Sequence, residues 1–140
     1  MLLSLQAELK KTIVFITHDL DEALKIGDDI AILRDGRMIQ QGDAQQIVLN
    51  PIDDYVSSFV KDINRGRVVR VSTIMEAVSA NANGFTITAD TLLEQALGEL
   101  CDSEYDSACV VDADGKAVGA VNMQGVVDVI TRRDCDEAAE

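Results

Sequence analysis

Apolar and polar positions follow two kinds of pattern in the first part of the chain. The leucines of residues 2–11 have helical spacing, whereas Thr12–Thr17 is an unbroken β-branched and aromatic run. Such a run is typical of a strand buried on both faces of a parallel sheet. Apolar residues then recur at helical spacing over 20–26, after an N-cap at Asp19 or Asp21. The pattern predicts helix, strand and helix in this order.

Shorter patterns follow. The runs 29–33 and 37–41 flank Arg34-Asp35-Gly36, and Asp-Gly between two apolar runs predicts a β-hairpin. Helices are expected at 43–49 and 53–63, the second with an apolar stripe on one face.

The second half of the chain has a different order of elements. A short helix is expected to begin within 72–78, and a strand is expected at 85–87. Thr91 and Glu94 have the spacing of a capping box, whose cap contributes about 1 kcal/mol to the helix that it opens. Two strands and a last helix are expected at 108–111, 117–121 and 126–133. The order strand, helix, strand, strand, helix predicts an α+β module.

Charge divides the chain at a similar place. Residues 1–70 carry 9 basic and 11 acidic side chains, and residues 71–140 carry 3 basic and 14 acidic ones. The basic segment 64–70 contains a glycine and is expected to be a linker. The predicted organisation is a first part, a basic linker, a second part and an acidic tail that is a solvated, frayed end: 1–63, 64–70, 71–133 and 134–140.

Composition excludes several classes of protein. A hydrophobic share of 47% is typical of a globular chain, and a net charge of −13 argues against non-specific nucleic-acid binding. No apolar run approaches the roughly 18 residues of a membrane span, and the N-terminal residues do not form a signal peptide. The cysteines, which lack metal-site spacing, are expected to be free thiols. We therefore expect an intracellular protein with no nucleic-acid partner, no transmembrane segment and no metal site.

His18 stands at the C-terminal end of the predicted strand Thr12–Thr17. Open α/β sheets place ligand-contacting groups at this end of their strands. The alternative is a hydrogen-bonded loop histidine, and spacing alone favours it because a single histidine has no catalytic partner in the pattern.

Three strings in the first part have a distinctive order and spacing: TIVFITHDLDEA at 12–23, GDDIA at 27–31 and RDGRMIQQG at 34–42. Together they resemble the C-terminal part of an ABC transporter ATPase subunit. The continuation at 47–62 is similar to the glycine betaine/proline (quaternary amine) importer branch, and the resemblance covers residues 1–63. It implies an α/β remnant of an ABC ATPase domain, in which His18 is the switch histidine that contacts the γ-phosphate of ATP.

Other parts of an ATPase site do not occur in these 140 residues. Its Gly-rich Lys loop would cradle the phosphates. The dipeptide Gly115-Lys116 lacks the earlier glycine of that loop, and there is no Ser-Gly-Gly signature. ATP and Mg²⁺ are therefore expected only in a complete parent subunit, and the chain alone is expected to be no enzyme and to need no cofactor. The chain is expected to be the tail of such a subunit, as a truncated gene product or an excised fragment.

Two strings in the second part, TLLEQAL at 91–97 and VVDADG at 110–115, resemble a single CBS motif. The resemblance implies an α+β CBS module that works in pairs and whose paired cleft binds adenosine-containing ligands. Ligand-binding members carry Thr or Ser after the third strand and Asp three residues later. Here Gly119 and Asn122 are the cleft candidates, with Gly125 at the Asp position. Asn122 is expected to cap the last helix rather than to bind a nucleotide.

The two resemblances together imply the C-terminal regulatory portion of the ATP-binding subunit of a glycine betaine/proline-type osmoprotectant importer. Its implied partners are the transporter membrane subunit and a second copy bound through the CBS face. Its implied location is the cytoplasmic side of the plasma membrane. The resemblance to osmoregulated importers also gives a second interpretation of the acidic tail, as an anionic element for ionic-strength regulation. The alternative is a stand-alone CBS-type dimerising or ligand- or ionic-strength-sensing protein with a relic ABC segment, and the reading frame upstream of Met1 distinguishes the two.

Overall fold

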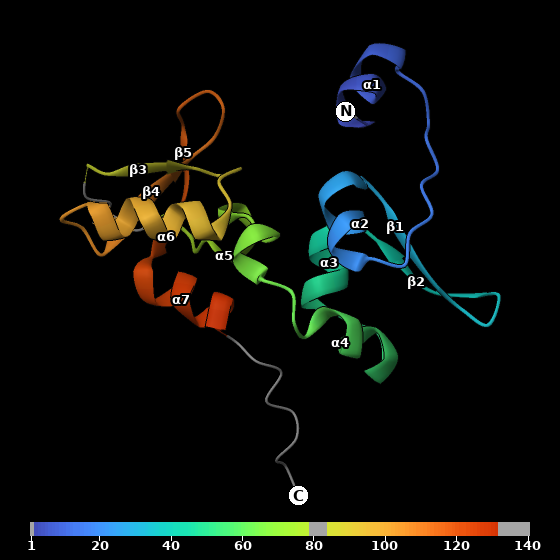
Figure 1. The fold of residues 1–140 in the computed structure, drawn as a ribbon. Coiled ribbons are helices and arrows are strands. Elements are labelled where there is room, and N and C mark those ends of the chain that lie inside the picture. Colours follow the sequence, from blue (N-terminus) through green and yellow to red (C-terminus); the bar gives the residue numbers. More distant parts are fainter. Residues whose placement is uncertain (1, 79–83, 132–140) are drawn as a thin grey trace, which may run out of the picture. The chain divides into compact units, whose positions relative to one another are not determined.

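The computed structural model describes residues 2–78 and 84–131 (Figure 1). The chain forms two compact units that divide between Ile63 and Asn64. We call them unit 1, up to residue 63, and unit 2, from residue 64. The acidic tail 134–140, with Cys135, lies outside the described residues.

Unit 1 contains four helices and one hairpin among its described residues: α1 (Leu2–Leu9), α2 (Leu20–Ile26), β1 (Ile30–Arg34), β2 (Arg37–Gly42), α3 (Ala44–Leu49) and α4 (Asp54–Val60). The predicted hairpin is confirmed, because β1 and β2 pair antiparallel. Its turn holds Asp35 at φ 51° and Gly36 at φ 74°, the positive values that a two-residue hairpin turn of matching twist requires. Three aspartates cap helices as N-cap residues, namely Asp19, Asp43 and Asp53.

The strand predicted at Thr12–Thr17 does not form, and this segment has no regular secondary structure. Val14 and Ile16 are 84% and 91% exposed. A β-branched run becomes a strand only when a neighbouring strand accepts and donates its backbone hydrogen bonds. In the sheet that the described part of unit 1 contains, β1 and β2 pair with each other. His18 therefore follows an irregular segment rather than the end of a sheet strand.

The core of unit 1 lies where β1 and the two short helices α3 and α4 bury their apolar sides. Its buried residues are Ile30, Ile47, Val48, Val56 and Val60. α3 packs on β2 and on α4, and its start is fixed by a capping box between Asp43 and Gln46. The apolar side chains of the segment before His18 take no part in this core.

Unit 2 is built on a three-stranded sheet: η1 (Arg65–Arg67), α5 (Val71–Ile74), β3 (Thr86–Thr88), α6 (Leu93–Asp102), β4 (Ser107–Val111), β5 (Ala117–Asn122) and α7 (Met123–Thr131). The sheet order is β3-β4-β5, with β3 parallel and β5 antiparallel to β4. α6 connects the parallel pair, as a crossover must. The predicted order strand, helix, strand, strand, helix is confirmed. The helix expected to begin within 72–78 is the short α5, which begins one residue earlier, at Val71.

The segment 64–70, expected to be a linker, is folded against unit 2. Arg65 is only 7% exposed, and Val69 is fully buried. The backbone carbonyl of Val69 accepts a hydrogen bond of 3.0 Å from the amide of Leu93. A Cβ on Gly66 would lie 3.2 Å from both the Glu94 Cβ and the Ile130 Cδ1, so this glycine lets the segment pack tightly on α6 and α7. The segment is therefore part of unit 2 rather than a linker.

The capping box predicted at Thr91 and Glu94 does not form either. α6 begins one residue later, with Leu92 at the N-cap position and no side-chain cap. The hydroxyls of Thr91 and Thr88 share a hydrogen bond of 2.7 Å. The Glu94 carboxylate instead accepts from the Arg67 guanidinium at 3.1 Å. Contacts with the 64–70 segment thus replace the local cap.

α6 packs on α7, and their apolar sides complete the core of unit 2. The buried hydrophobic residues are Val69, Val71, Ile87, Leu93, Ala96, Leu100, Ala108, Cys109, Val110, Val121 and Val126. Helices in the described part of the chain fall short of the length and apolar character that a membrane span needs.

Candidate functional site

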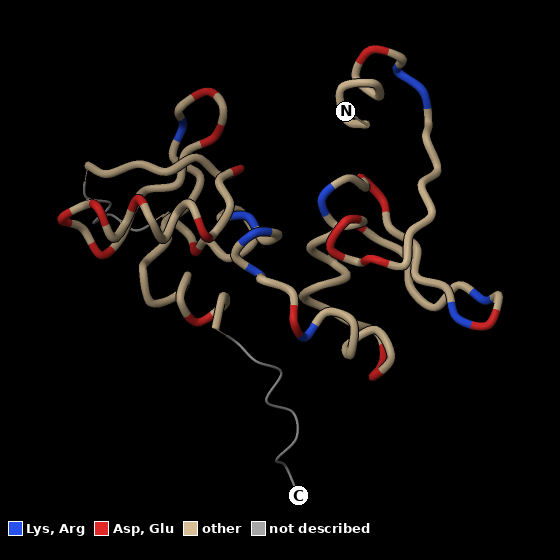
Figure 2. The backbone as a smooth tube through the Cα atoms, viewed as in Figure 1, with Lys and Arg blue, Asp and Glu red and all other residues tan. Residues whose placement is uncertain are grey.

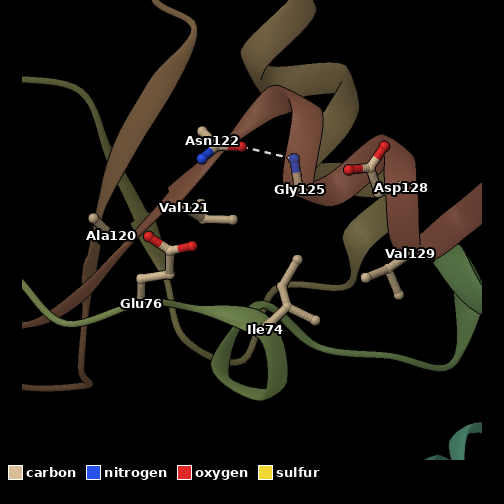
Figure 3. Close-up of a pocket in the computed structure, with 8 residues that line it drawn as sticks. All are labelled: Ile74, Glu76, Ala120, Val121, Asn122, Gly125, Asp128 and Val129. Carbon is tan, nitrogen blue, oxygen red and sulfur yellow. Dashed lines mark hydrogen bonds between the residues drawn. The ribbon is translucent and has the colours of Figure 1, made fainter.

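A pocket in unit 2 lies between the end of α5, β5 and α7 (Figure 3). Its volume is about 260 Å³, and its lining residues are Ile74, Glu76, Ala120, Val121, Asn122, Gly125, Asp128 and Val129. Ile74, Val121 and Val129 give the pocket apolar walls. Glu76, Asn122 and Asp128 supply its polar side chains.

The Glu76 wall of the pocket depends on Gly119. Glu76 and Ala120 exchange two backbone hydrogen bonds of 2.8 and 3.0 Å, which hold the segment after α5 against β5. A Cβ on Gly119 would lie 2.7 Å from the Glu76 carbonyl oxygen and 2.8 Å from the Met75 Sδ, and both separations are too short. Gly119, a predicted cleft candidate, is absent from the lining, and it allows the neighbouring backbone to come close.

Asn122, the second cleft candidate, lines the pocket and also caps a helix. Its side-chain oxygen accepts a hydrogen bond of 2.7 Å from the amide of Gly125 in the first turn of α7. The predicted cap is therefore present (Figure 3). The cap occupies both the Asn122 oxygen and one of the free amides at the start of the helix.

Two carboxylates face this pocket, Glu76 from the segment after α5 and Asp128 from α7. Asp128 also accepts a hydrogen bond of 2.7 Å from the Gln124 side-chain amide. The described lining contains no Lys or Arg, so its electrostatic potential is negative. Spacing could have placed Asp128 here, because it follows Gly125 by three residues on one helix face. Only the tertiary pairing with Ala120 brings in Glu76, which the sequence reasoning missed.

His18 lies in unit 1, exposed, in the bend before α2. The Thr17 hydroxyl accepts a hydrogen bond of 3.0 Å from the Asp19 amide and donates one of 3.1 Å to the Glu22 carboxylate. The Asp19 carboxylate accepts from the amides of Asp21 and Glu22 at 3.0 and 3.4 Å. The backbone on the α2 side of His18 is thus fixed by local bonds, and its imidazole ring is open to solvent.

The described cysteines, Cys101 on α6 and Cys109 on β4, are free thiols. Across the described ranges 2–78 and 84–131, no three His, Cys, Asp or Glu side chains gather as a metal site would require.

Relatives of this chain are found among transport proteins. It is 36% identical over 133 residues to the trimethylamine N-oxide transport system ATP-binding protein of Pelagibacter ubique, covering 94% of this chain and 39% of that protein. The chain is homologous to part of an importer ATP-binding subunit. It is also 39% identical over 128 residues to the glycine betaine/carnitine transport ATP-binding protein of Listeria monocytogenes, covering 89% of this chain and 30% of that protein. The resemblance to this class of subunit is thereby confirmed.

The chain spans less than two fifths of the length of either importer subunit, and the matched region runs through both of its units. No family model matches it. A CBS-domain pair with bound AMP from Klebsiella pneumoniae aligns with 84% of this chain and 84% of its own, at 13% identity and a TM-score of 0.31. A TM-score this low is no basis for comparing folds.

Proposed function

We propose that this chain is the C-terminal regulatory portion of the ATP-binding subunit of a glycine betaine/proline-type osmoprotectant importer. The observation that carries the proposal is the match to the Pelagibacter ubique ATP-binding protein, at 36% identity over 133 residues. This single match runs through both units. Unit 1 is then the C-terminal part of an ABC ATPase domain, and unit 2 is a CBS module. The complete subunit uses ATP and Mg²⁺, binds the transporter membrane subunit, and works on the cytoplasmic side of the membrane.

Within this proposal, His18 is the switch histidine of the complete ATPase site. Its exposed ring and the hydrogen bonds of Thr17 and Asp19 support the role, because a solvent-facing imidazole on fixed backbone can meet a phosphate without rearrangement. The exposed apolar segment before His18 also supports it. Side chains such as those of Val14 and Ile16 have the character of a buried parallel strand, and further strands of a complete domain would cover them.

Unit 2 supplies the regulatory part of the proposal. The predicted order of strands and helices supports a single CBS motif, and the small sheet supports association with a second copy. The 140 residues hold no Gly-rich Lys loop, so the chain by itself has no phosphate cradle and is proposed not to hydrolyse ATP.

A chimera tests the proposal. Residues 1–140 replace the matching region of the Listeria monocytogenes glycine betaine/carnitine transport ATP-binding protein, and ATP turnover is measured with the membrane subunit of that transporter. We expect the chimera to hydrolyse ATP. His18→Ala should lower kcat about 100-fold or more, the effect of losing one donor to a transition-state oxyanion.

Lys25→Ala is the matched control, because Lys25 is an exposed cation on α2 that pairs with Asp21 at 3.6 Å. It should leave kcat within about twofold, as a surface ion pair contributes little. The 140-residue chain alone should show no turnover. A folded chimera that is inactive, or one that keeps its activity after His18→Ala, would contradict the proposed role.

A further inference from the structure

We infer that the unit 2 pocket excludes nucleotide phosphates, so that unit 2 does not sense adenine nucleotides through it. The inference rests on the proposed assignment of unit 2 to a CBS module, which implies an adenosine-containing ligand. The pocket does not suit an adenosine-containing phosphate ligand in its charge, in its free hydrogen-bond donors or in its size.

Charge opposes a phosphate most directly. Glu76 and Asp128 both line the pocket, and no basic side chain stands among the described lining residues. A phosphate monoester carries about −1.5 to −2 charges at neutral pH and is bound in proteins by cations and backbone amides. Both carboxylates are exposed, and at close range their negative charges repel such a group.

Two of the backbone donors that could compensate are already in use, and one of them is the Met123 amide, which donates to the Asp106 carbonyl at 2.8 Å. The first turn of a helix is the usual anion site, because its amides lack partners within the helix. At the start of α7 the Asn122 side chain accepts a hydrogen bond of 2.7 Å from the Gly125 amide, so this amide is not free to bind an anion. Gly125 also stands where ligand-binding CBS motifs carry an aspartate for the ribose, and a glycine has no side chain to offer.

The size of the pocket within one copy points the same way. The pocket measures about 260 Å³, whereas sites for drug-sized ligands usually measure about 300–1,000 Å³. Its apolar walls, Ile74, Val121 and Val129, suit a small uncharged group rather than a nucleotide. The regulation proposed for unit 2 therefore acts through something other than an adenine nucleotide in this pocket.

Binding of AMP and of adenosine to the full 140-residue chain tests the inference, by calorimetric titration at millimolar ligand. The two probes differ only in the phosphate. We expect wild-type protein to bind AMP no more tightly than adenosine. The double variant Glu76→Gln/Asp128→Asn should raise the affinity for AMP relative to adenosine about tenfold or more, since it removes both opposing charges.

Glu99→Gln/Asp102→Asn is the matched control, because it changes the net charge equally at two exposed α6 positions outside the pocket lining. It should leave the AMP-to-adenosine ratio unchanged. Circular dichroism confirms that each variant is folded. Saturable wild-type binding of AMP that is tighter than that of adenosine overturns the inference. So does a double variant that binds AMP no better than the control variant. The chimera assay contains no AMP, so either proposal can fail alone.

Discussion

At the scale of single residues, two glycines of unit 2 have opposite roles. Gly119 lies where β5 meets the Met75–Glu76 backbone, and a methyl group there would overlap the Glu76 carbonyl at 2.7 Å. Gly98 lies within α6 with no heavy atom within 4 Å of where its Cβ would be. One glycine is required by packing, and the other only weakens its helix.

We therefore expect Gly119→Ala to destabilise the chain by about 1–3 kcal/mol, because backbone must move to admit the methyl group. Gly98→Ala, the matched control, should stabilise it by about 0.5–1 kcal/mol, the helix-propensity difference between the two residues. Urea unfolding followed by circular dichroism measures both free energies. Equal effects of the two substitutions would show that the contact at Gly119 is not tight.

At the scale of elements, unit 1 leaves one apolar segment uncovered. Ile13, Val14, Phe15 and Ile16 are all exposed and lie outside the core formed by β1, α3 and α4. An apolar backbone segment with free hydrogen-bonding groups is a site of aggregation. In the proposed complete domain the same segment would be a buried strand. Its sequence therefore suits a context larger than unit 1.

The double variant Val14→Lys/Ile16→Lys should increase the soluble yield of the 140-residue chain several-fold, because it places charge on the two most exposed positions of this segment. Its free energy of unfolding should change by less than about 0.5 kcal/mol. Soluble yield after centrifugation and urea unfolding are the measurements. Ile47→Lys is the contrasting variant, because Ile47 is fully buried and a lysine there should unfold unit 1. An unchanged or lower yield from the exposed pair would count against this view of the segment.

At the scale of the whole molecule, charge is the dominant feature. The chain has a net charge of −13. Most of this charge comes from residues 71–140, which carry 14 acidic and only 3 basic side chains. Figure 2 shows acidic positions along α6 and at the β4–β5 loop, and basic positions gathered around η1. Two of the arginines are engaged within unit 2, in the pairs Arg67–Glu94 at 3.1 Å and Arg70–Asp90 at 3.7 Å. Two copies of unit 2 that associate must therefore overcome like-charge repulsion.

Self-association of residues 64–140 should tighten as salt is raised. The screening length falls from about 10 Å at 0.1 M to about 3 Å at 1 M ionic strength, which weakens the repulsion between copies. Sedimentation equilibrium from low to high KCl gives the dimer Kd. The variant Glu99→Gln/Asp102→Asn should show a weaker dependence on salt. A Kd that stays flat or rises with salt would show that attraction between arginines and acidic groups governs association instead.

The sequence alone determined the features that depend on near neighbours. The Asp35-Gly36 hairpin and the Asn122 cap of α7 need only residues within a few positions, so their patterns could be recognised. The sequence also predicted an aspartate cap for α2 at Asp19 or Asp21, and the structure places it at Asp19. The order of elements in unit 2 followed from the same local signals. The resemblance to an ABC ATPase subunit, rather than local spacing, made His18 a candidate, and its assignment to an ATP site stays a proposal. Asn122 caps α7, as expected from its position.

Tertiary structure decided the features that depend on a distant partner. Thr12–Thr17 has the composition of a strand, yet no strand beside it supplies a hydrogen-bonding edge in the described part of unit 1. The segment 64–70 is not a linker, because the Val69 carbonyl accepts a hydrogen bond from the Leu93 amide on α6. Thr91 does not form a capping box, because the Glu94 side chain pairs with Arg67 instead. Glu76 reaches the pocket only through its backbone pairing with Ala120. Hydrogen bonds between residues far apart in the chain have no signature in local spacing, so only the folded structure fixes where they form.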